Sequence, residues 1–427
     1  MIRRPPRSTQ GVSSAASDVY KRQVGITNFA HAQLDFAAPA SVGMSQESLN
    51  QATTRLQQHI DDGDIAGVVA AVARDGKIVY FESLGLMDIE KMKPMRGDAL
   101  FRIYSMARQI TTVAALTLYE QGKFDMDDPI QMYLPEFENQ RVLLDSDSND
   151  VSQTRKRIGD ITVQHLITHT SGLGSRSSRL YRENRVRDKN ITLDQMVSNA
   201  ARIPLFQDPG TEFRYGIHAT ILGKLIEIWA ERPFEEFLRE EFLLRMNMSS
   251  TMFWADGAHR NRLAVVYRPT NGQLTPYQIE SIPYTMRPRL MEGGVGLLST
   301  VGDFINFSQM ILDGGVFQGE RILREETVDL IYQNAVPEQA MPIGSGGYWG
   351  GSGWTWGGFN LVLDAETYSY PISEGTIWWD GSAGTRFFID PKQNTVIVIM
   401  AQVSPSRGGG FRENFSRLVD MAITERR

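Results

Sequence analysis

The stretch FRIYSMARQITTVAALTLYEQGK, residues 101–123, holds the side chains best placed to do chemistry. Ser105 precedes apolar residues that recur at helical spacing as far as Gly122, and Arg108 follows Ser105 by one turn. The start of a helix supplies free N–H groups and the positive end of a dipole, both suited to a developing oxyanion. Ser105 is therefore a candidate nucleophile. The pattern S-x-x-[KR] also occurs in plain helix caps, and arginine cannot accept the serine proton because it stays protonated.

The six histidines offer no stronger candidate. His165 and His169 have the i,i+4 spacing that can hold a metal ion, but no glutamate lies between them as in H-E-x-x-H. We interpret both as structural histidines and expect no metal. The chain lacks a G-x-S-x-G elbow, a phosphate-binding glycine loop and a dinucleotide fingerprint, so we expect no cofactor. The glycine-rich segment 344–354 is interpreted as a flexible loop.

Composition narrows the class of protein and of partner. The 427 residues are 41% hydrophobic and 22% charged, which is ordinary for a globular chain. The net charge of −6 argues against nucleic acid as a partner. The sequence contains no run of ~18 apolar residues, so it predicts no transmembrane segment. The absence of cysteine excludes thiolate chemistry and disulfides. A small-molecule substrate is the expected partner, and the oligomeric state is left open.

The first part of the chain, residues 1–33, reads differently from the rest. Its start is basic and serine-rich without hydrophobic periodicity, so we predict a disordered or non-native tail. Ala30-His31-Ala32 before Gln33 has the small-x-small form of a signal-peptidase site. If it is the remnant of a secretory signal, the protein is periplasmic or secreted. If the pattern arose by chance, a cytoplasmic location stays open.

The remaining elements follow from hydrophobic periodicity and turn residues. Strand patterns surround Asp75-Gly76 and the turn at 391–394, and we expect polar loops at 145–160 and 175–190. Helical patterns lie at both ends and throughout the middle of the chain, at 45–64, 162–173, 192–203, 218–231, 233–243, 301–315 and 412–426.

This order of elements predicts an α+β fold in which both ends of the chain build one antiparallel sheet. We place one domain at 34–427. Its sheet is drawn from about 41–100 and 316–427, and a mostly helical subdomain covers about 101–315. A cleft between the two parts is the expected ligand site.

Several segments, read together and in order, resemble a known family. They are FRIYSMARQITTVAALTLYEQGKFDMDDPIQMYLPEF, ITVQHLITHTSGL, FRYGIHATILGKLIE, GGVGLLSTVGDFINFSQMIL and WWDGSAGTRFFIDP. The chain resembles the serine β-lactamase-like superfamily, and within it the class C β-lactamase-like esterases, or family VIII carboxylesterases. The resemblance implies a β-lactamase and penicillin-binding-protein-like fold and a serine hydrolase that forms an acyl-enzyme.

The family pattern of S-x-x-K, Y-x-N and a strand motif assigns roles to residues of this sequence. Ser105 matches the nucleophile, and Arg108 stands where the family has lysine. Tyr215 matches the tyrosine of the second motif, with Ile217 at the asparagine position. Trp379-Asp380-Gly381 resembles the W-x-G strand motif of the esterases. Ser382 would then supply an oxyanion N–H beside that of Ser105.

These departures carry information on the substrate. The resemblance implies that the strand-motif lysine holds a carboxylate and that the asparagine contacts an amide, and neither Trp379 nor Ile217 can do so. Both changes favour neutral, short-chain carboxylic esters over anionic β-lactams. Trp378, Trp379 and Phe387 either line such a site or pack in the core.

Arg108 can still act as a fixed charge. A cation beside Tyr215 would stabilise its phenolate, which could then accept the Ser105 proton and return it to the leaving alcohol. The sequence therefore favours a carboxylesterase-type serine hydrolase. The alternatives are a β-lactamase or D-Ala-D-Ala peptidase of the same fold, or a binding protein whose site has decayed at Arg108.

Overall fold

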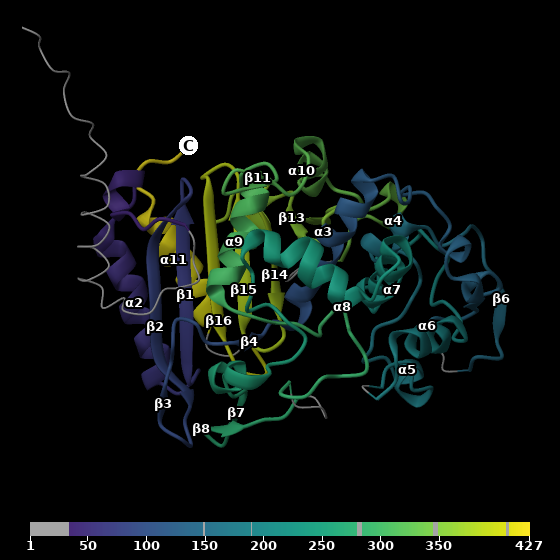
Figure 1. Cartoon of the computed structure of the whole chain (residues 1–427), viewed down its shortest axis with the longest axis horizontal. Coiled ribbons are helices and arrows are strands. Elements are labelled where there is room, and N and C mark those ends of the chain that lie inside the picture. Colours follow the sequence, from purple (N-terminus) through teal and green to yellow (C-terminus); the bar gives the residue numbers. More distant parts are fainter. Residues whose placement is uncertain (1–33, 148–149, 189, 280–283, 345–348, 407–409) are drawn as a thin grey trace, which may run out of the picture.

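The computed structural model describes residues 34–147, 150–188, 190–279, 284–344, 349–406 and 410–427. Figure 1 shows how these segments are arranged. The tail at 1–33, with the sequence Ala30-His31-Ala32, lies outside the described residues. Within the described ranges, no helix combines the length and apolar character needed to cross a membrane.

An eight-stranded antiparallel sheet forms one half of the molecule, in the order β12-β13-β14-β15-β16-β1-β2-β3 (Figure 1). Strand β16 pairs with β1, so segments from the two ends of the sequence meet inside the sheet. The predicted α+β fold is therefore confirmed. The strands are β1 Gly67–Arg74, β2 Lys77–Asp88, β3 Lys93–Pro94, β12 Ser352–Trp354, β13 Asn360–Val362, β14 Ile377–Gly381, β15 Thr385–Asp390 and β16 Thr395–Ala401.

The hairpins at both ends of the sequence form where turn residues predicted them. Asp75 and Gly76 join β1 to β2 with φ angles of 52° and 70°. Two consecutive positive φ angles are those of a type I′ turn, whose twist matches that of the flanking strands. Asn394, with φ 48°, helps to close the second hairpin between β15 and β16.

Helices cover both faces of the sheet, which explains why every residue of β1 is buried. Val68, Ala70 and Val72 face one layer, made by α2 (Gln46–Asp61) and α11 (Phe411–Ala422). The alternate residues of β1 face α9 (Val301–Leu312), and α3 (Ala107–Glu120) belongs to the same core. Because strand side chains alternate between faces, an unbroken apolar run is what a doubly covered strand needs.

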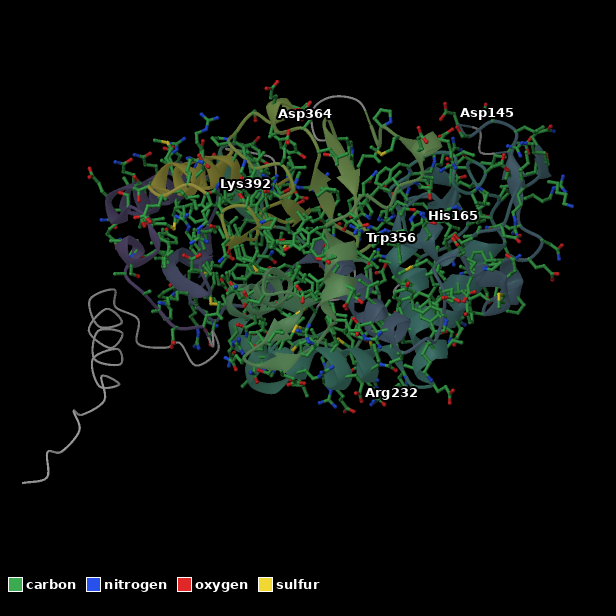
Figure 2. The ribbon with its side chains drawn as sticks, turned by 90° about the horizontal axis from the view of Figure 1, so that it is seen from above. Asp145, His165, Arg232, Trp356, Asp364 and Lys392 are labelled. Atoms are coloured by element: carbon green, nitrogen blue, oxygen red, sulfur yellow. The ribbon has the colours of Figure 1, made fainter. Side chains whose placement is uncertain are left out.

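The helical half lies on the other side of α3 and α9 in Figure 1. It contains α4 Val163–Ile167, α5 Arg179–Glu183, α6 Leu193–Ala201, α7 His218–Ala230 and α8 Phe234–Phe237. A later helix, α10, spans Glu325–Ile331. Figure 2 places Lys392 in the sheet half and His165 in the helical half, with Trp356 between them.

Short two-stranded ladders complete the backbone pairing. Strand β4, Phe101–Arg102, pairs with β9, Leu298–Ser299. The remaining ladders are β5 Arg141–Leu143 with β6 Thr154–Lys156, β7 Tyr267–Thr270 with β8 Gln273–Pro276, and β10 Val316–Phe317 with β11 Glu320–Arg321.

The structure differs from the sequence prediction in several local elements. The polar segment 145–160, expected to be a loop, contains β6, whose Arg155 is anchored by an ion pair with Asp208 (2.6 Å). The end of 344–354 forms β12 rather than a flexible loop, because its backbone pairs with β13. The helix expected over 162–173 ends at Ile167, since His169 takes the left-handed φ of 58°.

Candidate functional site

Ser105 lies in a tight connection between a strand and a helix. Strand β4 ends at Arg102, residues Tyr104–Met106 form a 3₁₀ turn (η2), and α3 begins at Ala107. Ser105 therefore stands just before the α-helix rather than within its first turn. The preceding Tyr104 has a φ of 43°, a left-handed value that is uncommon for a residue with a Cβ and is often found at functional sites.

Arg108 and Tyr215 are in direct contact. The Nε of Arg108 donates a hydrogen bond to the Tyr215 hydroxyl, and its Cζ lies 4.3 Å from the centre of the tyrosine ring. Arg108 is buried, with 6% of its surface exposed. A Cβ on Gly294 would lie 2.6 Å from Nη1 of Arg108, so the guanidinium fits only because glycine occupies that position.

Trp379 completes the contacts of the Tyr215 oxygen. Its Nε1 donates a hydrogen bond of 3.0 Å to the same hydroxyl, and the two rings lie 5.2 Å apart. Two N–H groups from distant segments, α3 and β14, therefore converge on one phenol oxygen. Hydrogen-bond donors in this arrangement stabilise negative charge on the oxygen that accepts them.

The end of β14 packs against the connection that carries Ser105. A Cβ on Gly381 would lie 2.4 Å from the carbonyl oxygen of Ile103, so only glycine permits this approach. Ser382 follows in the turn before β15 and is exposed. The backbone at 381 thus lies beside the connection that carries Ser105.

Asp380 anchors the strand that carries Trp379 and Gly381. Its Oδ2 accepts hydrogen bonds from Arg386 (3.2 Å) and Arg412 (3.1 Å), both of which are buried. Arg412 belongs to α11, so this contact ties the end of β14 to the helical layer behind the sheet.

The other candidate residues have packing contacts. Trp378 faces away from the site and stacks on Phe388 at 5.8 Å, because adjacent strand residues point to opposite faces. Phe387 is buried against Phe304 at 4.7 Å. Ile217 is 3% exposed and belongs to the main core, while its N–H donates to the carbonyl of Gly174.

An aromatic wall that sequence reasoning missed surrounds Tyr215. Trp349 lies 6.1 Å and Trp354 5.9 Å from the Tyr215 ring, and Phe213 lies 5.3 Å from Trp349. Trp354 is held in place by its Nε1, which donates to the carbonyl of Ile167 (3.0 Å). Trp349 and Trp354 both lie in the glycine-rich segment 344–354, and their presence there could have indicated the wall from the sequence.

A pair of buried histidines lies behind Tyr215. The rings of His169 and Tyr215 are 4.6 Å apart, and Nδ1 of His169 lies 2.7 Å from Nδ1 of His218. One of the two nitrogens must donate and the other accept, so the contact cannot form between two imidazolium rings. Burial lowers the pKa of His169, helped by His218 and Arg108, and burial with the charge of Arg108 lowers the pKa of His218 to about 3.

The histidine spacing does not produce a metal site. Helix α4 ends before His169, and Nδ1 of His165 accepts a hydrogen bond from the N–H of Thr162 in a capping box. Among the residues that the structure describes, no group of three or more His, Cys, Asp or Glu is placed to hold a metal ion.

The buried pair predicts a loss of stability in mild acid. The unfolded chain gains a proton on each histidine below pH ~6.5, whereas the folded chain keeps both neutral, so the free energy of unfolding falls as pH falls. Each histidine contributes a slope of up to ~1.4 kcal/mol per pH unit. Asparagine suits the positive φ at this position. We therefore expect His169→Asn to take up about one proton fewer on unfolding, so that its free energy of unfolding, measured in urea between pH 7 and pH 5, falls less steeply than that of the parent.

His259→Asn is the matched control, because His259 lies outside the pair and is partly exposed. The control should keep the parent slope. An equal slope in the parent and in His169→Asn would show that the pair takes up protons while folded.

The chain matches known proteins over almost all of its described length. A protein-family model described as Beta-lactamase matches residues 52–419. Protein Rv1367c of Mycobacterium tuberculosis is 28% identical over 366 residues, covering 83% of this chain and 90% of that protein. Esterase EstB of Burkholderia gladioli is 27% identical over 379 residues, covering 81% and 88%.

A solved structure shares the same architecture. The chain superimposes on EstCE1, described as a hydrolase with promiscuous acyltransferase activity, with a TM-score of 0.75 and 26% sequence identity. The match covers 87% of this chain and 98% of EstCE1. Together with the family match over 52–419, this places the chain in the β-lactamase family, among relatives that include esterases.

Proposed function

We propose that the protein is a serine hydrolase that cleaves short-chain carboxylic esters through an acyl-enzyme on Ser105. The observation that carries this proposal is the convergence of Arg108 and Trp379 on the oxygen of Tyr215. Arg108 lies in the first turn of α3, and Ser105 lies in the 3₁₀ turn immediately before that helix, so this contact holds the phenol near the same helix end. The names of EstB and EstCE1 support an ester as the substrate class.

In the first step, Tyr215 acts as the base. Its phenolate, stabilised by the two N–H donors, takes the proton of the Ser105 hydroxyl while Oγ attacks the ester carbonyl. The carbonyl oxygen gains the negative charge, and the backbone N–H groups of Ser105 and Ser382 stabilise it. Tyr215 then returns the proton to the leaving alkoxide, which departs as the alcohol.

The second step repeats the first with water. Water gives its proton to Tyr215 while its oxygen attacks the acyl carbonyl, and Ser105 regains the proton as the acid leaves. Arg108 keeps one charge throughout, because arginine does not titrate in this pH range. In this proposal its role is electrostatic, and Tyr215 carries the proton.

Acyl transfer to an alcohol is a second candidate activity. The wall of Phe213, Trp349 and Trp354 beside Tyr215 makes an apolar approach suited to an organic alcohol. The description of EstCE1 includes acyltransferase activity. In the presence of 1-butanol, this route would give a butyl ester in addition to the free acid.

Covalent labelling tests the nucleophile and separates an enzyme from a decayed site. A fluorophosphonate should add once to the parent, giving one adduct in the intact mass. Ser105→Ala should remain unlabelled, because the attacking oxygen is gone. An unlabelled parent would favour the binding-protein alternative, and a labelled Ser105→Ala would place the nucleophile elsewhere.

Substrate preference separates an esterase from a β-lactamase. Trp379 stands where a lysine would hold the carboxylate of a cephalosporin, and its indole N–H is already bonded to Tyr215. We therefore expect kcat/KM for p-nitrophenyl butyrate to exceed that for a cephalosporin by ~100-fold or more, equivalent to ~2.7 kcal/mol or more. A cephalosporin value equal to or above that of the ester would contradict the assignment.

The pH dependence of activity tests the roles of Arg108 and Tyr215. Arg108→Lys should keep or improve activity, because lysine carries the charge and can also relay protons. Arg108→Met should lose at least ~10-fold at pH 7, because the fixed charge that stabilises negative charge on the Tyr215 oxygen is gone. Tyr215→Phe should lose ~10²–10⁴-fold at every pH because the base is absent.

The measurement is kcat/KM against pH for the parent and the three variants. Equal profiles for Arg108→Met and the parent would remove Arg108 from the proton route. Full activity in Tyr215→Phe would show that another group is the base.

A further inference from the structure

A cavity adjoins the connection that carries Ser105. It has a volume of about 720 Å³ and is lined by Arg102, Tyr104 and Tyr284 among others. Tyr104 immediately precedes Ser105, and it packs with Ala383, which immediately follows Ser382. Ile279, which also lines the cavity, joins the same cluster. A ligand in this cavity would therefore lie next to the segments that hold the reacting ester in the proposed function.

Arg102 brings an uncompensated positive charge to this cavity. Its Nη1 donates to the carbonyl of Ala264 (2.7 Å) and to Oε1 of Gln402 (3.5 Å), and its Cζ lies 5.3 Å from the ring of Tyr284. No carboxylate of the described chain forms an ion pair with it, and its Nε and Nη2 bond to none of the described residues. Withdrawing a cation from water without an opposite charge is unfavourable, which suggests that a ligand supplies the anion.

The rim of the cavity is also basic. Arg260 is exposed and, within the described ranges, its guanidinium forms neither an ion pair nor a hydrogen bond. Lys93 donates to the carbonyl of Asn261 and adds a further positive charge to the lining. Asp88, the carboxylate among the described lining residues, is already paired with Lys91 at 2.8 Å. Among the described lining residues, positive charge therefore exceeds negative charge.

We propose that this cavity is a subsite for a carboxylate carried by the ester substrate, held by Arg102 within the cavity and by Arg260 at its rim. The proposal rests on the ester hydrolysis proposed for Ser105. The side of a guanidinium formed by Nε and Nη2 matches the two oxygens of a carboxylate. Trp379 brings no cation to such a group, so in this proposal Arg102 and Arg260 supply the positive charge.

Two matched pairs of substrates test the subsite from either side of the ester bond. The first pair is mono-p-nitrophenyl glutarate and its methyl-capped diester, in which the acyl chain carries or lacks the charge. The second pair is the butyrate ester of 4-hydroxybenzoate and that of methyl 4-hydroxybenzoate, in which the alcohol carries or lacks it. We expect the charged member of one pair to have a kcat/KM at least ~10-fold higher, which one charge-assisted contact can supply.

The ratio between charged and uncharged members is then measured in variants. Arg260→Ser should lower this ratio several-fold because it removes a charge. Arg102→Lys should do the same, because lysine keeps the charge but lacks the paired N–H groups of the guanidinium. Lys123→Ser, which removes one exposed charge at the far end of α3, should keep both the ratio and the activity of the parent. A ratio near one for both pairs in the parent, or an equal preference in all variants, would overturn the proposal.

A binding measurement distinguishes failure of the subsite from failure of the proposed function. Free glutarate at ~10 mM should raise the Tm of the parent and of Lys123→Ser, but not that of Arg260→Ser, because a ligand that binds only the folded state stabilises it. If no ester is cleaved but this rise is seen, the proposed function fails and the anion subsite stands. If neutral esters are cleaved and glutarate gives no rise, the subsite fails and the esterase stands.

Discussion

The candidate site depends on one phenol oxygen that accepts hydrogen bonds from two distant segments. Arg108 reaches it from α3 and Trp379 from β14, while Tyr215 itself precedes α7. Each of these elements belongs to a different part of the fold, so the contact forms only when the sheet and the helical half are packed together. The oxygen is thereby held near the N-terminal end of α3, the helix that Ser105 precedes, and the charge of Arg108 is directed onto it. Any chemistry that needs a proton acceptor near Ser105 depends on this contact.

Glycine at a few positions allows these segments to approach so closely. Gly294 leaves room for the guanidinium of Arg108, and Gly381 lets β14 lie against the carbonyl of Ile103. Asp380 then holds β14 through two buried arginines, so a shift of the strand would break both of these contacts. Close approach and charge pairing act together here. Close approach brings the end of β14 beside the connection that carries Ser105, and charge pairing keeps it there.

The sequence predicts the frame of this protein better than the surroundings of its site. Alternating and helical apolar patterns at both ends indicate the sheet and its covering helices, and motif order brings Ser105, Arg108, Tyr215 and Trp379 together. Such patterns depend on residues close in sequence. The aromatic wall depends instead on the packing of Trp349 against segments more than a hundred residues away, which no local pattern records. A strand period likewise shows that Trp378 and Trp379 face opposite ways, but not which of them faces Tyr215.

The histidine pair and the arginines define how charge is distributed around Ser105. His169 and His218 are buried and neutral, and Arg108 forms no ion pair with any carboxylate of the described chain. The positive charge of Arg108 is therefore directed at Tyr215 rather than cancelled, and in a buried site it acts more strongly than it would in water. Had either histidine been charged, two cations would share the space behind the phenol and repel each other. A lysine in place of Arg108 could lose its proton in these surroundings, whereas arginine cannot. Arginine at this position therefore cannot carry a proton, but it keeps a positive charge that does not change with pH.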